Sequence, residues 1–133
     1  METTKQQSSR RQTEAAIRMF HEGKFDCAIT LAAAAEGMLP DTNDPHLFQA
    51  LRGAEEFQEL KLNLMINWLK HSNSPETRAN VATLNEFEAA FVIARAITKF
   101  NAVYHLSCMP FEEFLKWAIR HDHLPRQIRP ISD

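Results

Sequence analysis

Apolar side chains recur every three to four residues along most of this chain, which is the spacing that places them on one face of an α-helix. Glycines, prolines and short polar residues interrupt the pattern and divide it into segments. The pattern predicts five helices: one ending near Gly23, then Phe25 to Met38, Asp44 or Pro45 to His71, Asn80 or Thr83 to Tyr104, and Pro110 to Ile119. We therefore expect an all-α fold, an up-and-down bundle of four main helices plus a short C-terminal helix.

The fourth predicted helix has two different faces. The face expected in the core is apolar and carries Ala89, Ala90, Ile93, Ile97, Phe100 and Tyr104. The opposite face carries Glu88, Phe91, Arg95 and Lys99. Glu88 and Arg95 are about two turns apart on that side, and residues so placed more often face solvent or a partner than form a site.

Length and charge limit the possible classes of protein. A chain of 133 residues is enough for one domain, with a disordered N-terminus over 1–9, a helical bundle over 10–121 and an extended tail over 122–133. A net charge of −2 creates no overall basic field toward nucleic acid or an anionic membrane. The start lacks an apolar leader and no apolar run is long enough to span a bilayer, which predicts a cytoplasmic protein without membrane contact.

Cysteine and histidine spacing gives no sign of a metal site. Cys27 and Cys108 lie in apolar helical contexts without zinc-ligand spacing, and we interpret both as core thiols in a reducing compartment. His105, His121 and His123 lack the His-Glu-x-x-His pattern. We expect no metal and no other cofactor.

Polar side chains interrupt the apolar face of the third predicted helix. Asn63, Asn67 and His71, spaced by fours, fall in the same arc as Leu60 and Leu64. Burying such groups without partners costs about 1–3 kcal/mol each. This face is therefore expected to meet another polar surface or to line a site.

Each of these polar residues also has a purely structural interpretation. His71 can donate to the last free carbonyls of its helix. Asn63 and Asn67 can fix the register of a helix pair or of a symmetric dimer. Glu36 can be a solvated helix end, or a partner for Lys70 or His71 across the opening hairpin.

Three segments suggest a family. They are the opening hairpin with Glu22-Gly23-Lys24-Phe25 and Ala35-Glu36, the helix end Asn67-Trp68-Leu69-Lys70-His71, and the run Ile93-Ala94-Arg95-Ala96-Ile97. Over about residues 13–105 the chain resembles HEPN-like domains, small helical proteins of nucleotide- and RNA-related systems. The resemblance implies a bundle that dimerises with its two His-bearing helix ends face to face. In active members it also implies a metal-independent ribonuclease built on Arg-x(4–6)-His.

The chain departs from that catalytic motif. Ile66 precedes Asn67 where active members have Arg, and no Arg precedes a His at the required gap. His71 can act as the base that takes the 2′-hydroxyl proton. Lys70 only partly replaces the guanidinium fork that matches phosphate oxygens. The incomplete motif argues against an enzyme.

Three hypotheses follow from these residues. The leading one is a non-catalytic or weakly catalytic HEPN-like binding or regulatory module, a homodimer whose polar patch of Asn63, Asn67, Lys70 and His71 lies near the dimer seam. The second is a divergent metal-independent endoribonuclease using His71 with Lys70 or a cation of the dimer mate, so that RNA or a nucleotide is a possible partner. The third is a structural adaptor whose partner helix covers the Phe91 face.

Overall fold

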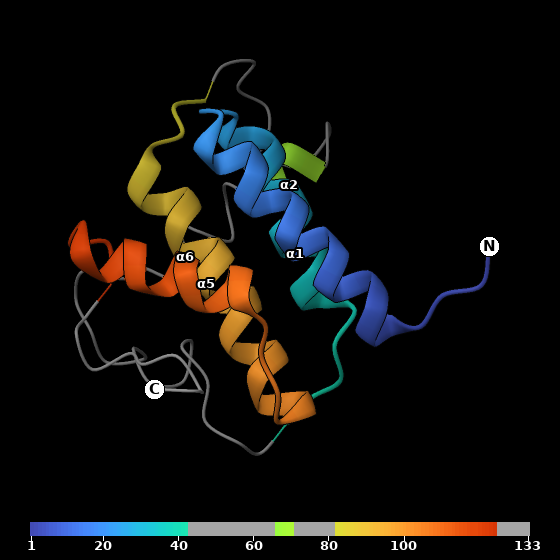
Figure 1. The fold of residues 1–133 in the computed structure, drawn as a ribbon. Helices are drawn as coiled ribbons and strands as arrows, with labels where there is room; N and C mark the ends of the chain where they lie inside the picture. Colours follow the sequence, from blue (N-terminus) through green and yellow to red (C-terminus); the bar gives the residue numbers. More distant parts are fainter. Residues whose placement is uncertain (43–65, 71–81, 125–133) are drawn as a thin grey trace.

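The computed structural model describes residues 1–42, 66–70 and 82–124. Within these ranges the chain forms helices α1 (Lys5–His21), α2 (Phe25–Gly37), α5 (Glu86–Tyr104) and α6 (Met109–Arg120), and residues 66–70 are also helical. Figure 1 shows their arrangement. The described parts contain no strand, so the predicted all-α class is confirmed.

Helix α1 begins earlier than the sequence analysis predicted. The hydroxyl of Thr4 accepts a hydrogen bond from the Gln7 N–H at 3.0 Å, which caps the helix and lets it start at Lys5. Ser9 and Thr13 are each only 1% exposed. The expectation of a disordered segment over 1–9 is therefore wrong from Lys5 onward, because a capped helix carries small hydroxyl side chains into the interior.

The turn between α1 and α2 follows the local signals in the sequence. Gly23 has a φ of +78°, and the Lys24 N–H bonds to the Met19 carbonyl at 2.9 Å. This is the hydrogen bond that closes a helix with a left-handed glycine. Helix α2 then returns along α1, with Ala28 and Ala32 fully buried so that the two helices can approach closely.

Helix α5 packs against both helices of this hairpin (Figure 1). Its predicted core face is buried, apart from the partly exposed Tyr104. The opposite face is not solvated as expected: Glu88, Phe91 and Arg95 are only 5%, 3% and 8% exposed. Helix α5 is thus buried on all sides from Glu88 to Ile97, as expected for a central helix. The surface that a structural adaptor would offer around Phe91 is already covered.

The start of α5 is also different from the prediction. Asn85 is the cap, because its side chain accepts from the Glu88 N–H at 2.8 Å while the Glu88 carboxylate accepts from the Asn85 N–H at 3.4 Å. This reciprocal arrangement is a capping box. Thr83 precedes the helix, and Asn80 lies outside the described residues.

Helix α6 begins as predicted, with Pro110 in its first turn. Its apolar side buries Phe111, Phe114 and Leu115. The chain continues to pack against the core beyond α6, since Leu124 is only 5% exposed. The extended tail predicted from residue 122 is therefore wrong as far as Leu124, and its remainder lies outside the described residues.

Within the described ranges, no helix combines the length and the apolar character that crossing a membrane requires.

Candidate functional site

The predicted polar patch is only partly within the described residues. Asn63 and His71 lie outside them, whereas Asn67 and Lys70 belong to the helical segment 66–70. Both of these side chains are exposed, and Ile66 and Leu69 pack against the core instead. Since residues three apart share a helix face, Ile66 and Leu69 define the buried side. The expectation that Asn67 interrupts a buried stripe is therefore wrong.

The segment 66–70 lies beside the first turns of α2. Leu69 lines a shallow cleft of about 390 Å³ together with Met19, Cys27, Thr30 and Leu31. Cys27 is exposed, so its assignment as a core thiol is wrong. It falls in the first turn of α2, where its N–H donates to the Asp26 carboxylate at 2.8 Å.

Cys108 comes closer to the predicted core thiol, because its side chain is half-buried. Burial raises the pKa of the Cys108 thiol above its ordinary value, while the Phe111 N–H and the Arg10 guanidinium act in the opposite direction. Neither cysteine belongs to a metal-binding cluster, since the described residues contain no group of three or more His, Cys, Asp or Glu side chains that could hold an ion.

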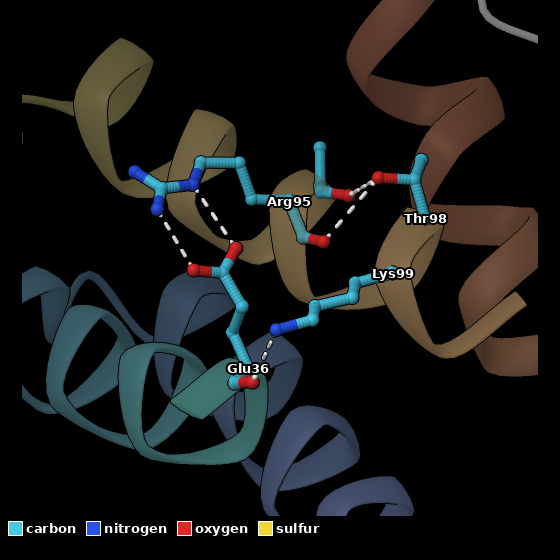
Figure 2. A network of polar contacts seen from close by, with 5 residues as sticks. Glu36, Arg95, Thr98 and Lys99 are labelled. Carbon is cyan, nitrogen blue, oxygen red and sulfur yellow. Dashed lines mark hydrogen bonds and ion pairs between the residues drawn. The ribbon is translucent and has the colours of Figure 1, made fainter. Parts of the chain in front are cut away.

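Glu36, the fifth residue of the predicted site, takes part in a buried polar network (Figure 2). Its carboxylate accepts two hydrogen bonds from Arg95, from Nε at 3.0 Å and from Nη2 at 2.8 Å. The side chains of Arg95 and Glu36 are only 10% and 19% exposed. Glu36 is thus neither a solvated helix end nor a partner of Lys70. The alternative partner predicted for it, His71, lies outside the described residues.

Lys99 extends the network by one turn of α5. Its Nζ donates to the backbone carbonyl of Glu36 at 3.4 Å (Figure 2). That carbonyl belongs to the last turn of α2, where carbonyls lack partners within the helix and a cation interacts favourably with the helix dipole. Thr98 bonds back to the Ala94 carbonyl at 2.9 Å. The network joins the end of α2 to the middle of α5.

This arrangement limits what Arg95 can do chemically. A guanidinium that binds a carboxylate with two parallel hydrogen bonds has its strongest recognition edge occupied. Binding a phosphate there would require breaking a largely buried ion pair. The geometry therefore supports a structural role for Arg95.

Sequence reasoning missed the pairing of Arg95 although a signal was present. Arg95 stands alone in an otherwise apolar run, Ile93-Ala94-Arg95-Ala96-Ile97, and a buried charge needs an opposite charge nearby. The partner could not be chosen, because it lies 59 residues away.

Aromatic and histidine side chains from several helix ends meet in a second cluster, which was not predicted from the sequence. Trp117 of α6 stacks on His121 with ring centroids 4.1 Å apart and meets His21 of α1 edge-on at 5.3 Å. Beyond α6, Nε2 of His123 lies 2.8 Å from a carboxylate oxygen of Glu86, at the start of α5. His21, His121 and His123 thus join helix ends through aromatic contacts and hydrogen bonds.

No family model, curated protein sequence or solved structure matches this chain. The resemblance to HEPN-like domains therefore stays a prediction from three sequence segments. The all-α architecture rests on the structure alone.

Proposed function

We propose that the protein is a non-catalytic, HEPN-like binding module that acts as a homodimer. The observation that carries the proposal is the position of Ile66, which stands where active members would have Arg and packs against the core. A phosphoryl-transfer site needs a fixed cation near the base. The side chain at this position instead holds its helix on the bundle.

The environment of Arg95 supports the same conclusion. Its guanidinium is committed to Glu36 and is only 10% exposed at the side chain. It cannot serve as a substitute for the missing cation without losing its partner. Lys70, the cation of this chain that was predicted to replace Arg, carries a point charge and lacks the planar fork that matches two phosphate oxygens.

The exposed side of segment 66–70 is the contact surface of the proposed dimer. Asn67 can both donate and accept hydrogen bonds, so it pairs readily with an identical side chain across a twofold axis. Lys70 lies one turn further on the same exposed side. In this arrangement Asn67 sets the register of two segments, as a single Asn does in coiled coils.

The oligomeric state tests the dimer. We expect sedimentation equilibrium to give a dimer for the wild type and a monomer for the double variant Asn67→Ala/Lys70→Ala. Gln7→Ala/Lys5→Ala is a matched control, because it removes another exposed amide and another exposed lysine, from α1. A wild type that stays monomeric, or a dimer unaffected by the first pair of substitutions, would contradict the proposal.

Cleavage of RNA tests the absence of catalysis. The wild type and His71→Ala are incubated with mixed transfer and messenger RNA in the presence of a metal chelator. We expect no cleavage by either protein. Cleavage by the wild type that disappears in His71→Ala would overturn the proposal and establish the ribonuclease alternative.

A further inference from the structure

A cleft of about 500 Å³ opens between α1 and α6, and its walls combine aromatic and charged side chains. Ile17, Phe114 and Trp117 provide the apolar part, and His21 and Arg120 are among the polar groups. This volume falls within the range of about 300–1,000 Å³ that is usual for small-molecule sites. None of these residues belongs to the proposed dimer surface.

The aromatic wall is held in place before any ligand arrives. Phe20 contacts Phe114 edge-to-face at 5.3 Å and Trp117 at 5.2 Å, which fixes both rings against the core. His121 stacks on Trp117 at 4.1 Å and His21 meets its ring edge-on at 5.3 Å. A ligand therefore loses little affinity to ordering these side chains.

The charges around the cleft are mostly positive. Lys116 and Arg120, one turn apart on α6, are exposed at its rim. The one acidic residue in the lining is Glu113, which disfavours a second negative charge on a ligand. We propose that this cleft binds a small amphiphilic monoanion, with an apolar group against Trp117 and a single carboxylate at Lys116 and Arg120.

Tryptophan fluorescence can report binding directly. The chain has only two tryptophans, so Trp68→Phe leaves Trp117 as the sole indole. In this background 3-phenylpropionate is the probe, and its uncharged analogue 3-phenylpropanamide is the control ligand. We expect a saturable change for the acid with a Kd on the order of 1 mM, and a much weaker response to the amide.

Three variants in the same background separate charge recognition from nonspecific apolar contact. Lys116→Ala/Arg120→Ala should weaken binding of the acid about five-fold, the scale of exposed charge contacts. Glu113→Gln should strengthen it several-fold, and Lys5→Ala, at the far end of α1, should leave it unchanged. Because these side chains are exposed, circular dichroism should show an unaltered fold.

Three results would overturn this inference. The first is equal affinity for the acid and the amide, which would show that the charges do not contribute. The second is the absence of a saturable response to the acid. The third is a Glu113→Gln variant that binds the acid no more tightly than the parent. The oligomeric state does not enter these measurements, so failure of the dimer proposal would remain distinguishable.

Discussion

The guanidinium of Arg95 donates two hydrogen bonds to the carboxylate of Glu36, a residue 59 positions away in the sequence, and so joins α5 to α2. The two hydrogen bonds, at 3.0 and 2.8 Å, use parallel donors and acceptors, the geometry in which this kind of pair is strongest. Both side chains are more than four-fifths buried. The pair therefore fixes the position of α2 along the central helix.

Breaking this pair should destabilise the fold. Glu36→Gln leaves the Arg95 charge largely buried without its counter-charge, and we expect a loss of about 2–3 kcal/mol in the free energy of unfolding. This expected loss is smaller than the loss for a fully buried ion pair, because some solvent reaches both groups. Urea titration followed by circular dichroism measures it.

Two further variants identify the cause of that loss. The apolar replacement Glu36→Leu/Arg95→Met should recover most of the stability, since no charge then remains buried. Glu22→Gln is a matched control, because Glu22 forms an ion pair with Lys24 in which the side chains are 51% and 57% exposed. It should change stability by less than about 0.5 kcal/mol. A control as damaging as Glu36→Gln would contradict the assigned role.

The two described glycines should respond to alanine with opposite signs. Gly23 has a φ of +78°, and an added Cβ would meet nothing within 4 Å, so only backbone strain opposes Gly23→Ala. We expect a loss of about 1–2 kcal/mol. Gly37 is the last residue of α2, has no positive φ and also has open space around it. Gly37→Ala should therefore gain about 0.5 kcal/mol through higher helix propensity.

Thermal unfolding of both variants beside the wild type provides the comparison. The substitutions are the same chemically, so each serves as the control for the other. A Gly23→Ala protein as stable as the wild type would mean that the left-handed turn is not needed to end α1.

The start of α5 offers a test of the observed cap against the predicted one. Asn85→Ala removes the side-chain acceptor for the Glu88 N–H and should cost about 1 kcal/mol. Asn85→Asp keeps the acceptor and should cost much less. Thr83→Ala, at one of the two positions predicted for the start of this helix, should have little effect because Thr83 is exposed and precedes the cap. Urea midpoints that reverse this order would contradict the capping box.

Elements defined by local signals were predicted well, and those that depend on distant partners were not. Gly23 and Pro110 mark helix limits through backbone geometry that the residues themselves impose. The partner of Arg95 and the exposed side of Asn67 depend on how distant helices dock, which periodicity does not encode. The start of α1 was missed for another reason: its polar first turns were interpreted as disorder although Thr4 offers a cap.

The two cysteines should react at different rates, in contrast to the expectation that both are core thiols. Cys27 is exposed and Cys108 is half-buried. Burial also raises the pKa of Cys108, so a smaller fraction of it is thiolate at neutral pH. Alkylation by iodoacetamide at pH 7.5 or so should modify Cys27 at least several-fold faster. Mass spectrometry of the variants Cys27→Ser and Cys108→Ser assigns each rate.

The pH dependence of the folding stability tests the raised pKa of Cys108 independently of the alkylation rates. Because the folded pKa of Cys108 lies above its unfolded value, the protonated thiol contributes stability below the ordinary thiol pKa. That contribution is lost as the pH rises through the folded pKa. The wild type should therefore lose stability above about pH 9 relative to Cys108→Ser, which has no thiol to ionise there. Parallel stability curves for the two proteins would show that folding does not raise the pKa of Cys108, and equal alkylation rates would show that Cys108 is as reactive as Cys27.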